Sequence, residues 1–582
     1  MPSSPKTAYK FSNFRLLPND KQLLLNDTPV PLAPKAFDTL CLLVESRGSL
    51  VEKNEFLERV WQGSFVEEVV LAHAISQLRK ALQNGADKTD FIETVPKRGY
   101  RFRARVEVIP AEESDAPSRT TLAVLPFENL SADPEREYLA NGLTEEAIAA
   151  LGQVDPDHLG VIGRTSAMAY KGTTKSLAEI GRDLGADFLV EGSIRSEASR
   201  LRITSRLVRV RDQIQIWSDS HDSELGNVIE FQRELSVAIA RQIHLHLSPD
   251  RLLGLARRQT QHAEAYDVYL RGRYFWNQLS PLTTRRAVQF YARATELDPN
   301  YALAWCGLAD AYATSPINGD ANPLEVGPRA RDAAARAVSA GSHLAETHAS
   351  TGFVKFWLDW DWPAAERAFR RAIALDPNYS LAHRTLGIIL SHSNRHQEAQ
   401  SAARRARELD PLDFINQALS AQIAFNARDF QTAVDFSRRA TALDPEFWVS
   451  YIQLAQAYEQ LGEDDAAFDA LQKAGQFSSG NSKSIALRGY LFAKLGRTGE
   501  AREVLHTLEA VSRERYVPPY ATALVHAGLG EADAAFEWLE RACNAHDVHS
   551  VFLPVDPKWD PLRTDARFRA ILDRGGFRGG AS

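Results

Sequence analysis

Apolar residues in the C-terminal half of this 582-residue chain recur with helical spacing, and the pattern repeats every 34 residues. One alanine recurs at this interval, at Ala365, Ala399, Ala433, Ala467, Ala501 and Ala535. Leu-Asp-Pro triplets begin at Leu375, Leu409 and Leu443, with an earlier one at Leu297. Six alanines in one register make coincidence a poor explanation. The pattern predicts an array of helix pairs in which small residues lie where two helices approach closely.

A period of 34 residues resembles that of the tetratricopeptide (TPR) repeat, and this resemblance implies an all-α superhelix. About eight units are expected within residues 262–547, starting near 264, 302, 345, 380, 414, 448, 482 and 516. The second unit carries an insertion around 315–323. Residues 548–577, which include Trp559, are expected to form a C-terminal capping segment.

Residues 1–107 follow a different pattern, in which short β-like runs precede three amphipathic helices and a closing hairpin. The helices are expected from Pro34, over 53–61 and over about 67–82. The third buries Leu71, Ile75, Leu78 and Leu82 on one face. Its other face presents His73, Ser76, Gln77 and Lys80, with Arg79 at the flank.

Three segments of this region resemble the OmpR/PhoB-type winged helix-turn-helix, in the branch that includes CadC and ToxR. They are LxxVWxG at 57–63, ISQLRKAL at 75–82, and IETV followed by GYRF between 92 and 102. The resemblance implies that helix 67–82 enters the major groove of DNA and that the 96–99 turn reaches the minor groove. It places Ser76 and Gln77 at base- and backbone-reading positions. It places Trp61, Arg79, Thr94 and Tyr100 at phosphate-contacting positions.

Charge agrees with double-stranded DNA as the partner. Residues 1–107 hold 16 Lys and Arg against 13 Asp and Glu, although the whole chain has a net charge of −7. Five of the sixteen basic residues cluster in and after the hairpin turn, at Lys97, Arg98, Arg101, Arg103 and Arg105. Such a cluster neutralises phosphates and predicts salt-dependent binding.

Four positions depart from the family pattern. Gln77 stands where relatives often have arginine, and Ala72 stands where they often have an acidic residue. Val69 and Val70 stand where relatives are often polar. Gln can still bond adenine through two hydrogen bonds, so an altered sequence preference is expected. The same departures support an alternative function, a cytoplasmic TPR scaffold or adaptor whose winged helix is a protein-interaction module.

A linker is expected at 108–120, and residues 121–248 alternate strand and helix patterns, as in an α/β domain. They resemble the TolB N-terminal-like domain, which implies no catalytic residues. Gly142–Glu146, Arg164–Ser166 and Lys171 are candidates for an anion pocket. The more ordinary interpretation takes Glu145 and Glu146 as helix-surface charges and Arg164 as a solvated strand end, because no phosphate-cradling motif is present.

Other features favour a cytoplasmic protein without catalytic chemistry. Cys41, Cys306 and Cys543 lie too far apart in sequence to resemble a metal site, and the start of the chain lacks a signal-peptide pattern. No apolar run approaches membrane length. No catalytic, cofactor or metal motif stands out, and the cluster Trp357, Trp360 and Trp362 is expected to fill a repeat interface.

The predicted fold is multidomain α+β, with an N-terminal winged helix, a central α/β domain and a C-terminal all-α TPR superhelix. The predicted function is that of a sequence-specific transcription regulator. In this hypothesis the TPR groove binds a protein or peptide and modulates promoter occupancy. RNA polymerase is a further candidate partner, and two copies are expected on tandem half-sites.

Overall fold

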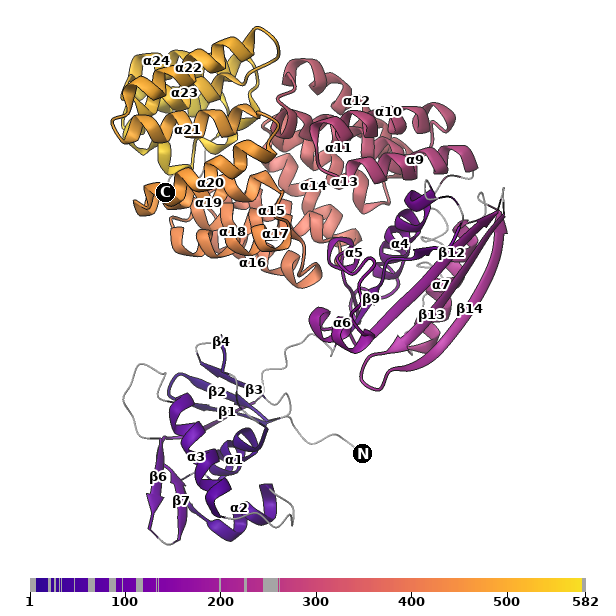
Figure 1. Ribbon diagram of the computed structural model, residues 1–582, viewed down its shortest axis with the longest axis vertical. Coiled ribbons are helices and arrows are strands. Elements are labelled where there is room, and N and C mark those ends of the chain that lie inside the picture. The colour runs from indigo at the N-terminus through magenta and orange to yellow at the C-terminus, as the bar shows by residue number, and fades with distance from the viewer. Residues whose placement is uncertain are drawn as a thin grey trace. The chain divides into compact units, whose positions relative to one another are not determined.

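The computed structural model describes residues 7–18, 22–25, 28–30, 32, 34–46, 48–60, 68–82, 91–96, 98–110, 119–131, 133, 136–197, 200–224, 228–243, 260 and 262–577. The chain divides into two compact units, Met1–Ser118 and Arg119–Ser582 (Figure 1). No helix within these described ranges is long and apolar enough to cross a membrane.

The first unit is the expected winged helix. It extends beyond residue 107, because residues 108–110, predicted as part of a linker, lie in a strand that pairs with residues 7–10. Its strands are β1 (Thr7–Phe11), β2 (Phe14–Leu17), β3 (Gln22–Leu25), β4 (Thr28–Pro29), β5 (Leu50–Glu52), β6 (Ile92–Val95), β7 (Gly99–Phe102) and β8 (Glu107–Pro110). Its helices are α1 (Pro34–Glu45), α2 (Lys53–Val60) and α3 (Glu68–Leu82). The strands form an antiparallel sheet in the order β4-β3-β2-β1-β8 and a small sheet in the order β5-β7-β6.

Four phenylalanines join the two sheets of this unit. The rings of Phe11 and Phe102 meet edge to face with centroids 4.9 Å apart, and Phe14 and Phe91 meet in the same way at 5.8 Å. All four side chains are buried, so a single aromatic core fixes the closing hairpin against the N-terminal strands.

The second unit begins with the α/β domain. Its elements are β9 (Thr120–Val124), β10 (Glu128–Asn129), α4 (Glu137–Gly152), β11 (Leu159–Val161), α5 (Arg164–Met168), α6 (Leu177–Leu184), β12 (Phe188–Glu197), β13 (Arg200–Arg209), β14 (Ile214–Glu224) and α7 (Val228–Gln242). The sheet order is β11-β9-β12-β13-β14, parallel at the first three strands and antiparallel beyond.

Strand β9 shows why helices cover both faces of this sheet. Leu122 and Val124 pack with α4 and α7 on one face of the sheet. Ala123 and the next-but-one residue, Leu125, pack with α6 on the other face. Successive residues of a strand point to opposite faces, so an apolar run without alternation requires cover on both sides.

The rest of the second unit is the helical array. Its paired helices are α9 (Ala263–Trp276) with α10 (Pro281–Leu297), α11 (Ala302–Gly319) with α12 (Pro323–Gly341), α13 (Ala345–Phe353) with α14 (Trp362–Leu375), α15 (Ser380–His392) with α16 (His396–Leu409), α17 (Phe414–Asn426) with α18 (Phe430–Leu443), α19 (Trp448–Leu461) with α20 (Asp464–Phe477), α21 (Ser482–Lys494) with α22 (Thr498–Ser512), and α23 (Pro519–Gly528) with α24 (Ala532–Asn544). A π-helical turn, η3 (Val354–Leu358), extends α13.

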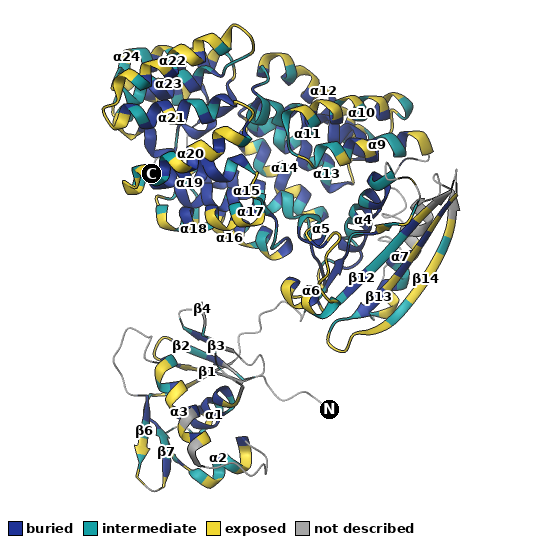
Figure 2. Cartoon of the chain, in the orientation of Figure 1, coloured by how far each residue is buried: buried dark blue, intermediate teal, exposed yellow. Residues whose placement is uncertain are grey.

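The six alanines of the repeat are at most 1% exposed, which confirms their expected place between helices. The helices of the array carry both buried and exposed residues (Figure 2). The insertion in the second unit lengthens α11 and α12 to 18 and 19 residues instead of adding a loop. Trp360 and Trp362 are buried and Trp357 is half-buried. Their rings pack largely against the C-terminal end of the chain and not only between repeats, since Trp360 contacts His546 and Phe577, and Trp357 contacts Phe552.

The C-terminal segment continues through η4 (Val548–Phe552), η5 (Pro557–Leu562) and α25 (Ala566–Arg574). Helix α25 packs against α24, as a cap does. Residues 547–562, however, lie on the inner face, which we define as the face formed by the first helices α15, α17, α19, α21 and α23. The ring of Phe552 lies 5.1 Å from that of His392 on α15, and Asp547 accepts a hydrogen bond from the backbone N–H of Tyr520 on α23.

Two adjacent side chains of η5 anchor the segment on this face. The Lys558 ammonium lies 4.9 Å from the ring centroid of Phe425 on α17 and donates to Gln456 on α19 at 3.3 Å. Asp556 balances this charge at 2.8 Å. Trp559 is fully buried and donates its indole N–H to Tyr520 at 2.8 Å. Residues 547–562 therefore cover part of the inner face of the array.

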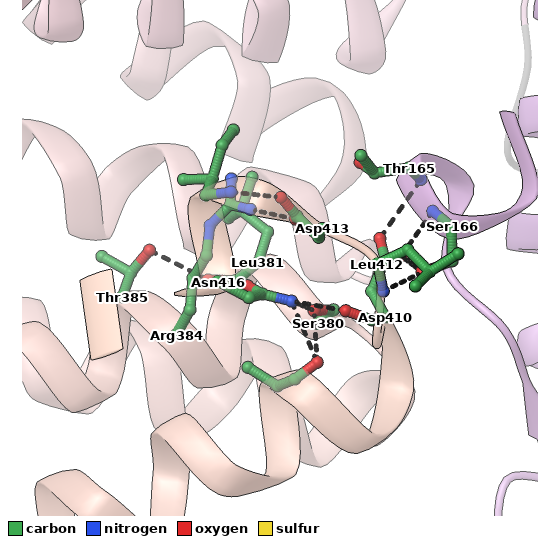
Figure 3. A network of polar contacts seen from close by, with 12 residues as sticks. Thr165, Ser166, Ser380, Leu381, Arg384, Thr385, Asp410, Leu412, Asp413 and Asn416 are labelled. Atoms are coloured by element: carbon green, nitrogen blue, oxygen red, sulfur yellow. Dashed lines mark hydrogen bonds and ion pairs between the residues drawn. The ribbon is translucent and has the colours of Figure 1, made fainter. Parts of the chain in front are cut away.

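The α/β domain is fastened to the loops of the array. Asp410, which follows α16, accepts hydrogen bonds from the backbone N–H groups of Ser166 at 2.7 Å and Thr165 at 3.2 Å, and from the Ser166 hydroxyl (Figure 3). The backbone N–H of Leu412 donates to the Ser166 hydroxyl at 2.7 Å. A Cβ at Gly163 would lie 2.4 Å from Asp410 Oδ2, so the close approach requires glycine at this position.

A second fastening lies one repeat earlier, at Asn378. Its amide nitrogen donates to the carbonyl oxygens of Gly152 at 2.8 Å and Leu159 at 3.1 Å. Its amide oxygen accepts from Arg119. Three segments of the α/β domain thus meet one side chain of the array.

Glu145 and Arg164 belong to the same contact, and Glu146 is buried as well, so the interpretation of these three residues as solvated surface charges was wrong. Glu145 forms ion pairs with Arg164 at 3.2 Å and with Arg273 of α9. Burial alone would raise the pKa of Glu145, but the two guanidinium groups lower it below its usual value. The array covers this surface, and the group that accepts hydrogen bonds from Thr165 and Ser166 is the array's own Asp410.

We predict that Asp410→Ala lowers the free energy of unfolding of the full chain by about 3 kcal/mol, because it leaves three donors of the 165–166 turn without their acceptor. Asp444→Ala is the matched control, since Asp444 occupies the same position one repeat later and accepts only locally, from the Glu446 N–H. Calorimetric melting of both variants checks this. Equal losses would show that the contact adds no stability.

The same carboxylate makes stability depend on pH. Burial, with the neighbouring charge of Asp413, raises the pKa of Asp410 to about 7, although its hydrogen bonds oppose that shift. The folded state then binds a proton that the unfolded chain releases, so stability should fall as the pH rises from about 4 to about 7. Melting temperatures from pH 5 to pH 8 should decline less steeply for Asp410→Asn than for the wild type or Asp444→Asn. An unchanged slope would assign the effect to Asp310, whose pKa burial also raises to about 7.

Candidate nucleic-acid interface

Helix α3 buries its apolar residues on one face and exposes polar residues on the other, as its sequence predicts. Leu71, Ile75, Leu78 and Leu82 are buried, at most 1% exposed. Ser76, Gln77 and Lys80 are exposed on the remaining face. Val70 is 43% exposed and adds an apolar patch near the start of the helix. The exposed polar side chains are of the kinds that hydrogen-bond base edges and phosphates.

The hairpin β6–β7 forms the wing. Strand register pairs Val95 with Gly99 and Thr94 with Tyr100, so the chain turns over residues 96–98. A Cβ at Gly99 would lie 2.0 Å from the carbonyl oxygen of Val51, so only glycine lets β7 pack this closely on β5. Tyr100 is half-buried, and its ring lies edge to face with Phe56 of α2 at 6.0 Å.

The arginines of the wing are held by weak, exposed ion pairs. Arg98 lies 3.8 Å from Glu52, and Arg101 and Arg103 share Glu93 at 3.6 and 3.7 Å. Exposed pairs of this kind contribute little to stability. A phosphate can therefore replace a glutamate at small cost, and two glutamates leave the three arginines with a surplus of positive charge.

Arg79 lies between the helix and the wing. Its guanidinium donates to the carbonyl oxygen of Ile92 at 2.7 Å and to the Thr94 hydroxyl at 2.8 Å. Ile92 is fully buried, so this bond satisfies a carbonyl at the edge of the core. Arg79 thus fixes the hairpin relative to α3, and its role toward phosphate stays a prediction.

The structure brings most of the predicted residues to one region of the first unit. Ser76, Gln77, Arg79 and Lys80 come from α3, while Thr94, Arg98, Tyr100 and Arg101 come from the hairpin. Trp61, Lys97 and the side chain of His73 lie outside the described residues. Prediction from the sequence missed the acidic partners Glu52 and Glu93. Pairing the strands across the turn would have found Glu93, since it stands directly opposite Arg101.

No cluster of three or more His, Cys, Asp or Glu side chains in the described parts of the chain is placed to hold a metal ion.

Comparison with known families agrees with this geometry. Residues 27–102 match the family described as "Transcriptional regulatory protein, C terminal", and they form a winged-helix domain of this type. Residues 118–237 match "HilA/YgeH-like transcriptional regulator, second domain". Residues 368–401 and 449–474 match tetratricopeptide repeats, which confirms the repeat assignment. The resemblance of 121–248 to the TolB N-terminal-like domain is not what this comparison returns, and it stays a prediction.

Individual relatives cover parts of the chain. "Putative adenylate cyclase 3" of Rhizobium meliloti is 33% identical over 202 residues, 35% of this chain and 34% of that protein. "Transcriptional regulator HilA" of Salmonella typhimurium is 27% identical over 307 residues, 52% of this chain and 53% of that protein. The chain thus spans a third to a half of these relatives. The solved DNA-binding domain of E. coli CadC is 27% identical and matches over its whole length and 18% of this chain, with a TM-score of 0.17.

We predict that Arg79→Ala destabilises the first unit by about 1–3 kcal/mol, because it removes the hydrogen bonds to Ile92 and Thr94. Lys80→Ala, at the adjacent exposed position, should change stability by less than about 0.5 kcal/mol. Urea unfolding of residues 1–118 measures both. Equal stability of the two variants would show that the Arg79 guanidinium does not anchor the hairpin, and would favour its use on phosphate.

Proposed function

We propose that the chain is a sequence-specific DNA-binding transcription regulator. The observation that carries this proposal is the exposed polar face of α3 beside a hairpin with a surplus of arginine. Helix α3 enters the major groove, where Ser76 and Gln77 reach base edges and the backbone. The wing follows the minor groove, and Arg98 and Arg101 exchange their glutamates for phosphates.

Several finer points belong to the same proposal. The families that match residues 27–102 and 118–237 are both described as those of transcriptional regulators, which supports a protein without catalytic activity. A cytoplasmic location suits a regulator that must reach DNA. Two copies on tandem half-sites would double the number of phosphate contacts.

We also propose that the array binds a protein or peptide partner, with RNA polymerase as one candidate. TPR superhelices offer extended inner surfaces for such partners. Here residues 547–562 cover the inner face, so a partner must use surface that this segment leaves uncovered or must replace the segment. The surface on which the proposed partner can dock is therefore smaller than the whole inner face.

A salt titration tests the DNA-binding proposal. The full chain and residues 1–118 should both bind duplex DNA, with affinity falling steeply as salt rises. Arg98→Ala should weaken binding to every sequence and lower the slope of log Kd against log salt by about one. Lys10→Ala is the matched control, since Lys10 is exposed on β1, in the other sheet. Fluorescence anisotropy at 50–300 mM salt gives these values.

The alternative function predicts the opposite result. A folded chain that does not bind DNA at low salt would be a TPR scaffold whose winged helix serves as a protein-interaction module. The exposed apolar Val70 on α3 is the feature that favours this alternative.

A further inference from the structure

Val70 is the one large apolar side chain that is exposed among the described residues of the first unit. It is the third residue of α3, the helix that the proposed function places in the major groove, and it is 43% exposed. An apolar side chain gains free energy when a partner covers it. The surroundings of Val70 on this helix therefore indicate which partner can do so.

Val70 and Gln77 lie on the same side of α3. Seven residues make about two turns of an α-helix, so the two side chains leave the helix in nearly the same direction, about 10.5 Å apart along its axis. Both residues are exposed. Successive bases of one DNA strand are about 3.4 Å apart. A helix that lies along the groove therefore brings Val70 to a base pair about three steps from the one that Gln77 meets.

A single valine is a poor docking surface for another protein. Specific protein interfaces bury about 800 Å² on each partner, and their cores hold several large side chains. Here Ser76, Gln77 and Lys80, which are also exposed on α3, are polar, and the wing adds a surplus of positive charge. This surface fits an anionic partner that presents hydrogen-bonding edges and isolated methyl groups.

Thymine presents such a methyl group. Its C5-methyl lies in the major groove beside the O4 acceptor, and the other three bases lack it. Valine carries two methyl groups on Cβ and in a helix keeps one preferred χ1 rotamer, so Val70 loses little side-chain entropy on contact. Covering one methyl group changes an affinity by about fourfold.

We propose that Val70 reads thymine. Its methyl groups pack against the C5-methyl of a thymine that lies about three base pairs from an adenine read by Gln77. The recognised half-site then holds an A·T pair at both positions, and the thymine methyl group itself carries part of the specificity. This inference rests on the proposed function, because it requires α3 to lie in the major groove.

Replacing thymine by uracil tests the inference, since this change removes the methyl group and keeps every hydrogen-bonding atom of the base. The probes are duplexes of alternating A and T, about two turns long, and the same duplexes with uracil. In the alternating sequence a thymine stands three steps after every adenine. The full chain should bind the thymine duplex about fourfold more tightly than the uracil duplex, by fluorescence anisotropy at fixed salt.

Three variants assign the preference to Val70. Val70→Ser removes both methyl groups at a similar helix propensity, and it should reduce the preference for thymine to less than about 1.5-fold. Val70→Ile keeps apolar groups at this position and should keep the preference. Lys80→Ala is the matched control, because it removes a neighbouring exposed charge. It should weaken binding to both duplexes and leave their ratio at about fourfold.

The outcomes separate this inference from the proposed function. Equal affinity of the wild type for the two duplexes would overturn the inference and leave the regulator proposal standing, since DNA is then bound without the methyl contact. A thymine preference that persists in Val70→Ser would assign the contact to another residue. A folded chain that binds neither duplex at low salt would overturn both proposals and favour the protein-interaction module.

Discussion

The close approach of paired helices at one alanine per repeat is the constraint on which the second unit depends. A methyl group at these six positions lets the two helices of a pair pack at the short end of interhelical distances. Each pair contacts its neighbours, so the geometry of one pair sets the position of the next. Contacts between residues far apart in sequence, such as Ser166 with Asp410, form only because this spacing is kept along the array.

Parts of the array's surface are covered by other segments of the same chain. The α/β domain is fastened to its loops, and residues 547–562 cover its inner face. Charges in these contacts are paired, as Glu145 is with two arginines and Lys558 with Asp556. Buried pairs of this kind add little net stability, but an unpaired partner is costly. Such contacts therefore select one arrangement of the domains over others.

Sequence periodicity predicts the elements well and the contacts between them poorly. The expected repeat starts agree with the first helices, because each buries its own small and large residues locally. Glu145 looked like a surface charge because its cover comes from Arg273, 128 residues away. Likewise, the C-terminal segment looked like a simple cap. Its place on the inner face depends on contacts with residues more than 100 positions away, such as Phe552 with His392, which no local pattern encodes. Arg79 was assigned to phosphate by resemblance, whereas packing also gives it the Ile92 carbonyl.

The free energies of these contacts limit how a bound effector can act on the second unit. Moving the α/β domain away from the array would exchange its hydrogen bonds to Asp410 and Asn378 for bonds to water, at about 0.5–1.5 kcal/mol for each bond, and several such bonds would be lost together. Typical allosteric coupling energies are also only about 1–3 kcal/mol in total. An effector of ordinary strength therefore cannot separate the two parts.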